Sequence, residues 1–163
     1  MLSSIVILVD TREKVNSHIT DYFDAHNILW KKKALSQGDY SFYVPANPEL
    51  SIPRDMYYTD EIIVERKASL EELSNNLSIE RDRFEKELSL MKAKTRYLLI
   101  ENASYKDVVE GNYETQYNKK SFLGSLHSFN HKYGLQICFL NNSQYSPIFI
   151  YGVMQYYLRN KIR

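Results

Sequence analysis

Acidic side chains stand where the predicted strands of this sequence begin or end. Asp10 closes one apolar run, Asp39 opens another behind a glycine, and Glu65 and Lys67 lie at the charged end of a third. Because strand side chains alternate, Glu65 and Lys67 share one face and Arg66 takes the other. Carboxylates at one edge of an open sheet suit Mg²⁺ or Mn²⁺, and a neighbouring lysine can orient or deprotonate water. Asp39, Glu65 and Lys67 therefore predict metal-dependent cleavage of a phosphodiester.

The triplet Glu65-Arg66-Lys67 also has a simpler interpretation, because E-x-K is common on exposed strands as a salt bridge. Two observations favour a catalytic site: the triplet follows the apolar run 62–64, and two further carboxylates stand at matching strand ends. His127 and His131 have the i, i+4 spacing that zinc sites use, but they have no acidic or cysteine partner beside them. We expect these two histidines to be surface or core residues.

Composition limits the class of protein. The chain has 163 residues, 44% of them hydrophobic and 25% charged, which predicts one domain with a packed core over 1–163. The net charge of +1 excludes a protein that coats nucleic acid through its overall charge, although a local basic patch is still possible. No apolar stretch approaches the roughly 20 residues that span a bilayer. We therefore expect no membrane partner and a cytoplasmic location.

The elements that must position these side chains follow from the apolar pattern. β-Branched and aromatic runs predict strands over 5–9, 28–33, 40–44, 61–67, 97–100 and 135–140. Apolar residues at helical spacing predict a helix from Val15 to Phe23, a short helix capped by Ser69, a longer one from Ser78, one over 122–133 and a last one opened by Pro147. Three prolines predict a surface loop over 45–60. Alternating strands and helices indicate an α/β fold with a mixed, largely parallel sheet between helices.

Three segments, in order along the chain, resemble the signatures of the XPF-type (ERCC4-domain) nuclease family. They are Val9-Asp10-Thr11-Arg12-Glu13 (V-D-x-R-E), Gly38-Asp39-Tyr40 (G-D-Y) and Val64-Glu65-Arg66-Lys67-Ala68-Ser69-Leu70-Glu71 (E-R-K-x-x-x-D). The similarity extends to the later strands and helices and covers nearly the whole chain. It implies a restriction-endonuclease-like fold of the PD-(D/E)xK type and cleavage of branched DNA, such as flaps, forks and nicked junctions, with a divalent metal. Glu71 departs from the pattern, since the family has Asp there.

The resemblance also implies roles for residues. Asp39, Glu65 and the backbone carbonyl of Arg66 would hold the metal, joined by Asp10 directly or through water. Lys67 would position the water that attacks phosphorus, leaving a 5′-phosphate and a 3′-hydroxyl. Supporting roles in holding a phosphate, orienting carboxylates or completing the outer part of the site fall to Arg12, Glu13, Arg66 and Glu71. Basic side chains that could contact DNA are Lys31, Lys32, Lys33, Arg81, Arg83 and Lys86.

Two other functions compete with this interpretation. A Holliday-junction resolvase or restriction-type nuclease would use the same chemistry on another substrate. A catalytically silent DNA-binding or dimerisation subunit would be expected to lose motif residues, and all four core residues are present here. Family members usually carry a further DNA-binding or helicase module for which 163 residues have no room, so we expect a stand-alone nuclease domain of the phage or prophage kind. Aromatic and apolar residues over 122–160 predict a homodimer.

Overall fold

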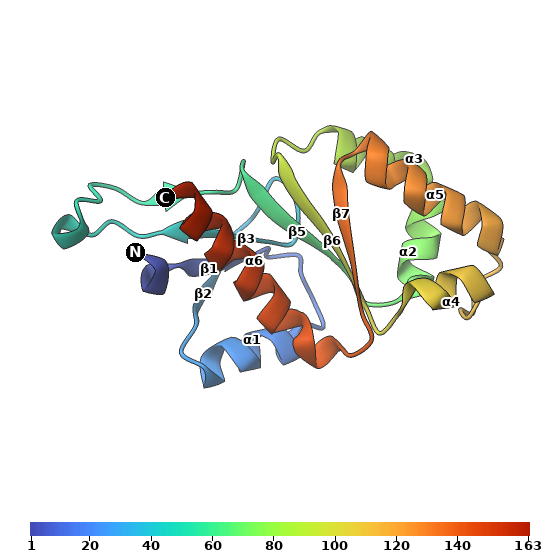
Figure 1. Ribbon diagram of the computed structural model, residues 1–163, viewed down its shortest axis with the longest axis horizontal. Coiled ribbons are helices and arrows are strands. Elements are labelled where there is room, and N and C mark those ends of the chain that lie inside the picture. The colour runs from blue at the N-terminus through green and yellow to red at the C-terminus, as the bar shows by residue number, and fades with distance from the viewer.

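The computed structural model describes residues 1–163 and has a seven-stranded sheet at its centre (Figure 1). The strand order is β2-β1-β3-β5-β6-β7, with β4 paired to β3. The strands are β1 (Val6–Val9), β2 (Leu29–Lys32), β3 (Tyr40–Val44), β4 (Met56–Tyr57), β5 (Ile62–Lys67), β6 (Thr95–Glu101) and β7 (Leu135–Leu140). The sheet is mixed, as predicted, but it is not largely parallel. Pairs β1/β2, β5/β6 and β6/β7 are parallel, whereas β3 runs antiparallel to β1, β4 and β5.

Helices cover the two faces of the sheet unequally. Helices α1 (Ser17–Ala25) and α6 (Ser146–Lys161) lie on one face. On the other face, α2 (Leu70–Leu77), α3 (Arg81–Ser89), α4 (Tyr105–Glu110) and α5 (Lys119–Lys132) lie over the β5–β7 half (Figure 1). Side chains of β5 alternate between the two cores, because Ile62 and Val64 face α1 and α6 while Ile63 faces the α2–α5 layer. No helix of the chain is long and apolar enough to cross a membrane.

The β1–β3 half of that second face has no helix over it. Its buried side chains form a small cluster of Val6, Leu8, Leu35 and Tyr43, which come from two strands and a loop. Leu29 of the edge strand β2 is 55% exposed. The sheet therefore presents one open half-face, next to the strand ends that carry the predicted site.

Several predicted boundaries are wrong, each for a local reason. Val15 is 90% exposed with φ +50° and stands outside α1, in a turn whose carbonyls face Arg66. Ser78 does not start the longer helix, since it ends α2 and its hydroxyl donates to the Ser74 carbonyl, so α3 begins at Arg81. The loop 45–60 contains a 3₁₀ turn at Pro48–Leu50 and the strand β4. The Ser69 cap is confirmed, because its hydroxyl accepts from the Glu72 amide.

Gly38 is the one glycine whose replacement should damage the fold beside the site. Its φ is +69°, and an added Cβ would lie 2.8 Å from the Ile63 Cβ. Left-handed backbone costs an L-residue about 1–2 kcal/mol, and overpacking adds about 1–3 kcal/mol. We expect Gly38→Ala to lower the free energy of unfolding by roughly 2–5 kcal/mol in urea titration. Gly124→Ala is the control, since Gly124 lies within α5 with nothing within 4 Å of an added Cβ; an equal loss there would contradict this explanation.

Candidate active site

A cavity of about 310 Å³ opens at the edge of the sheet where β1 and β5 end and β3 begins. The end of β1, the loop between β2 and β3, β5 and the C-terminal part of α3 all reach it. Its lining is mostly polar and consists of Asp10, Arg12, Ser36, Gln37, Gly38, Asp39, Glu65, Glu87, Leu90 and Met91. Three of the four predicted core residues, all but Lys67, therefore line one cavity.

Antiparallel pairing of β3 with β5 brings Asp39 beside Glu65. The Asp39 amide donates to the Val64 carbonyl at 2.9 Å, and the Arg66 amide donates to the Asp39 Oδ2 at 2.7 Å. Burial raises the pKa of Asp39 well above its usual value, and the neighbouring Glu65 charge raises it further. Burial also raises the pKa of Glu65, while Lys67 opposes that rise. Two partly buried carboxylates that repel each other beside a cavity can attract a cation.

Lys67 lies on the same face of β5 as Glu65, as strand alternation predicts. Its Nζ is 3.5 Å from the Glu65 Oε1 and 4.7 Å from the centre of the Phe84 ring of α3. The side chain is only 8% exposed. The ammonium is therefore fixed between a carboxylate and an aromatic face, where it can donate a hydrogen bond next to Glu65.

Arg66 points away from the cavity, and of the two roles expected of its side chain, holding a phosphate or orienting carboxylates, its contacts match the second. Its guanidinium is 5% exposed and donates to Glu13 at 2.8 Å and to Glu101 at 2.5 Å. Glu101 also contacts His18 at 2.7 Å and Ser146 at 2.5 Å. This network joins β5 to β6, α1 and the start of α6. Its effect on the site is to fix the backbone of Arg66, whose amide holds Asp39.

Asp10 has both carboxylate oxygens occupied by N–H donors. Oδ2 accepts from the Arg12 Nε at 2.8 Å, and Oδ1 accepts from the Leu35 amide at 2.8 Å. Arg12 also donates to the Leu35 carbonyl at 2.9 Å. Asp10 therefore holds the loop between β2 and β3, and a cation bound directly to it would share its oxygens with these donors. The Arg12 side chain, 74% exposed, stands at the mouth of the cavity.

Of the acidic residues on the helices, Glu71 was expected at the site but lies elsewhere, and Glu87 lies at the cavity instead. Glu71, at the position of the family's last acidic residue, accepts from the Glu114 amide at 3.0 Å and so fastens α2 to the segment before α5. Glu87 of α3 lines the cavity instead, with the exposed Arg83 3.3 Å away. The sequence shows Glu87 only as one more charge on a solvated helix.

Of the basic residues of α3 that were expected to contact DNA, Arg81 contacts Ser125 and the Phe129 ring, whereas Lys86 is exposed.

The donor set suits a small divalent cation with few protein ligands. The structure has no group of three His, Cys, Asp or Glu side chains placed to hold a metal ion. It does offer two mutually repelling carboxylates, Asp39 and Glu65, and Mg²⁺ is commonly bound through one or two carboxylates while it keeps several waters. These residues fit such an ion. His127 is not part of any such group, and its ring nitrogen contacts the Tyr105 hydroxyl at 2.9 Å.

Comparison with known protein families decides the identity of the fold. The family model described as the ERCC4 domain matches residues 9–153. The chain belongs to the ERCC4 domain family. The match includes all three motif segments, so the resemblance to XPF-type nucleases is confirmed. No curated protein sequence matches this ERCC4 domain.

Two solved structures are similar to this ERCC4 domain. XPF from Aeropyrum pernix has a TM-score of 0.67 and 17% identity, over 94% of this chain and 65% of that one. XPF from Aeropyrum pernix in complex with DNA has a TM-score of 0.66 and 16% identity, over 95% and 66%. The chain thus spans just under two thirds of each. The likeness confirms the restriction-endonuclease-like fold, a central mixed sheet flanked by helices.

Proposed function

We propose that this ERCC4 domain is a divalent-metal-dependent DNA endonuclease that cuts branched DNA such as flaps, forks and nicked junctions. The observation that carries the proposal is the partly buried pair Asp39 and Glu65 with the Lys67 ammonium 3.5 Å from Glu65. Membership of the family supports nuclease activity, and the A. pernix XPF solved with DNA supports DNA as the substrate. A branched DNA substrate supports our proposal of a cytoplasmic location.

Each residue of the site has a role that its geometry supports. Asp39, Glu65 and the Arg66 carbonyl would hold Mg²⁺ or Mn²⁺, which supplies Lewis-acid stabilisation of charge on the phosphodiester. The Lys67 ammonium orients the attacking water by donating a hydrogen bond to it from Nζ. Arg12, exposed at the cavity mouth, binds a phosphate next to the one that is cut. Glu13 and Glu101 act only through Arg66, by fixing the strand that carries Glu65 and Lys67.

A cleavage assay on matched substrates tests the proposal. We expect the purified protein to cut labelled flap, fork and nicked-junction DNA with Mg²⁺ or Mn²⁺, to cut linear duplex much less, and to be inactive in EDTA. Preferred cutting of intact four-way junctions would instead identify a resolvase, and cutting of linear duplex a restriction-type nuclease. Absence of cleavage with every metal and substrate would identify a silent DNA-binding subunit and overturn the proposal.

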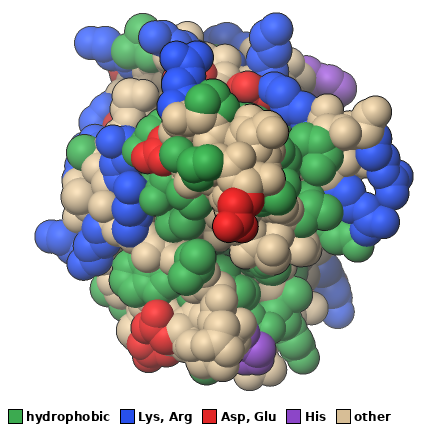
Figure 2. All heavy atoms as spheres, turned by 90° about the vertical axis from the view of Figure 1, so that its left-hand side faces the viewer, with side chains coloured by type: hydrophobic (Ala, Val, Ile, Leu, Met, Phe, Trp, Pro, Cys, Tyr) green, Lys and Arg blue, Asp and Glu red, His purple; other side chains and the backbone are tan.

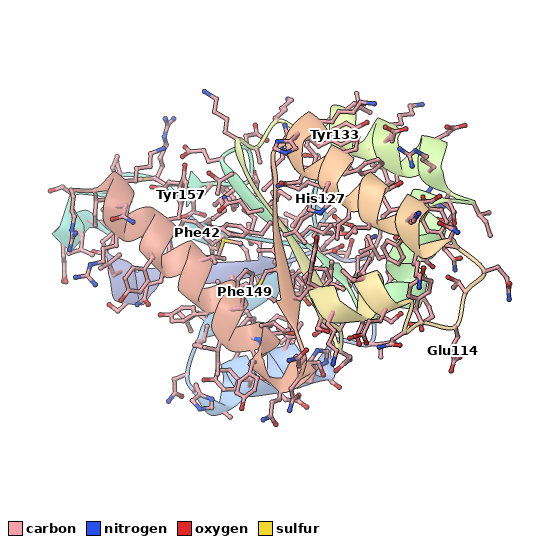
Figure 3. All side chains as sticks on the ribbon, turned by 45° about the vertical axis from the view of Figure 1, so that its right-hand side comes forward. Phe42, Glu114, His127, Tyr133, Phe149 and Tyr157 are labelled. Atoms are coloured by element: carbon pink, nitrogen blue, oxygen red, sulfur yellow. The ribbon has the colours of Figure 1, made fainter.

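We also propose a homodimer through residues 122–160, in which fewer of these residues can contact the partner than the sequence indicates. Phe149 and Tyr157 of α6 are used inside the chain, edge-on to Tyr97 and Phe42 (Figure 3). Exposed apolar side chains remain on α6 and just before it, and β7 beside it is a sheet edge with no partner on its outer side. The residues available for a partner are Tyr145 (52% exposed), Ile148 (50%), Tyr156 (54%) and the half-buried Val153.

Light scattering at micromolar concentration tests this assembly. We expect twice the chain mass of 19.3 kDa for the wild type and a monomer for Val153→Glu, because a carboxylate on the half-buried Val153 would be desolvated in an isologous contact. Val109→Glu is the matched control, since Val109 is 45% exposed on α4, outside residues 122–160. A wild-type mass of one chain would refute the dimer.

A further inference from the structure

The open half of the sheet begins at the candidate active site, and two lysines lie on its uncovered face. Val6 and Leu8 of β1 point into this half-face, and Lys31 pairs with Leu8 in the parallel register of β1 and β2. The Lys33 amide donates to the Val9 carbonyl at 2.9 Å, so Lys33 lies opposite Asp10 on this same face. Lys32 pairs with Val9 and points to the other side. Strand geometry thus divides the lysine run 31–33 into two that face the open sheet and one that does not.

Two tyrosines hold these lysines in place. The Lys31 Nζ lies 4.2 Å from the centre of the Tyr43 ring, and the Lys33 Nζ lies 5.3 Å from the centre of the Tyr57 ring. The two rings stack with their centres 5.0 Å apart. Tyr43 is 9% exposed and Tyr57 43% exposed, so the pair is anchored in the sheet and open on its outer side. We call Lys31, Lys33, Tyr43 and Tyr57 the lysine–tyrosine platform.

The charge of the platform is not neutralised within the chain. Neither Lys31 nor Lys33 forms a salt bridge, whereas Arg83, Lys132 and Lys161 each have a carboxylate partner. Contact with Tyr43 raises the pKa of Lys31 most, and the Asp55 carboxylate adds a smaller rise. The Asp55 side chain itself accepts from the Ala46 amide. Figure 2 looks onto the end of the molecule that holds the 45–60 loop, and Lys and Arg side chains lie along its left-hand margin as well as at its top and right-hand edges. Two uncompensated ammonium groups at fixed positions match a polyanion.

The platform continues into the catalytic cavity through one loop. Lys33 precedes the segment that Asp10 holds at the Leu35 amide, and Arg12 reaches back to the Leu35 carbonyl. Arg12 is itself part of the cavity lining. Basic side chains therefore lie on both sides of Asp10, with Lys31 and Lys33 on one side and Arg12 on the other, toward the cavity that holds Asp39 and Glu65. No helix stands between them, because α2–α5 cover only the β5–β7 half of this face (Figure 1).

We infer that the lysine–tyrosine platform binds the phosphodiester backbone of the DNA strand that leads to the cavity, with Lys31 and Lys33 each contacting a phosphate. The inference rests on the proposed nuclease function and adds the path of one substrate strand. Lys32 takes no part in this contact. Of the three lysines that were expected to contact DNA, the proposal therefore retains Lys31 and Lys33.

The test compares Lys31→Gln/Lys33→Gln with Lys32→Gln. Binding of fluorescein-labelled oligothymidylate and of a duplex of equal length is followed by anisotropy over a salt series, with Ca²⁺ in place of Mg²⁺ to prevent cleavage. The slope of log affinity against log salt is negative, and each lost phosphate contact makes it less steep by about 0.7 on a single strand and about 0.9 on duplex. We expect the double variant to bind more weakly, with a slope less steep by about 1.4 on the single strand or about 1.8 on duplex. The DNA on which this change appears identifies the type of strand that the platform binds.

Three results would overturn the inference. They are an unchanged affinity and slope in the double variant, an equal loss in Lys32→Gln, and a change of oligomeric mass in the double variant, which would make the platform a contact between copies of this chain. Thermal unfolding by circular dichroism verifies that both variants are folded. Cleavage by the wild type separates the two proposals: cleavage with unaltered binding in the double variant rejects the platform alone, and a silent wild type whose platform still binds DNA rejects the nuclease alone.

Discussion

Lys67→Met is expected to lower the rate of DNA cleavage by about 10²-fold or more while the protein still binds both metal and DNA. Methionine nearly preserves the volume of the side chain against Phe84 and removes only the ammonium, which lies 3.5 Å from the Glu65 Oε1. A positive charge so close to a proposed metal ligand opposes the binding of a cation. The variant should therefore bind Mg²⁺ at least as tightly as the wild type, and yet leave the DNA uncut.

Calorimetric titration of Mg²⁺ and single-turnover cleavage of one flap substrate measure the two effects separately. Lys92→Met is the matched control, because Lys92 is exposed and has no polar partner in the chain. It should retain both metal affinity and cleavage rate. Cleavage by Lys67→Met near the wild-type rate would remove Lys67 from the mechanism, and a parallel loss of metal affinity would make its role electrostatic support of the metal ligands.

The central strands β1, β3 and β5 could be predicted closely because nearly all of their residues are buried. The run 5–9 has no polar alternation, and all four residues of β1 are buried on both faces. Sequence could not show the order of the strands, since β1 lies between β2 and β3 only through contacts distant along the chain. It also missed α4, a six-residue helix that buries one residue, Val108, and is held by a capping box at Ser104. A helix so short has too little apolar periodicity to be recognised.

The site could be predicted to the extent that strand alternation determines it. Alternation alone separates Glu65 and Lys67 from Arg66, and the structure has this arrangement. Alternation could not reveal that Arg66 is enclosed by Glu13 and Glu101, because Glu101 lies 35 residues further along the chain. Glu87 was missed for a similar reason. It reaches the cavity through the packing of α3 on the sheet, and no local pattern distinguishes it from the other charged residues of that helix.

Asp39→Asn is expected to abolish cleavage and, in EDTA, to make the protein more stable than the wild type. Burial and the Glu65 charge raise the pKa of Asp39, so the folded protein binds more protons than the unfolded chain above the ordinary aspartate pKa. Its stability therefore falls as pH rises from that value to the raised one, by about 1.4 kcal/mol for each unit of the rise. Asparagine has no charge to lose, and its side-chain oxygen can still accept from the Arg66 amide.

Mg²⁺ should reverse this order of stability. In the wild type the cation takes the place of the protons and stabilises the fold by about 2.7 kcal/mol at a hundred times its Kd, whereas the variant lacks one anionic ligand and should respond little. Thermal unfolding between pH 5 and 8, with and without Mg²⁺, measures both effects. Asp21→Asn, at an exposed position of α1, should behave as the wild type. If Asp39→Asn were less stable than the wild type in EDTA and still stabilised by Mg²⁺, Asp39 would be a structural residue and the metal would bind elsewhere.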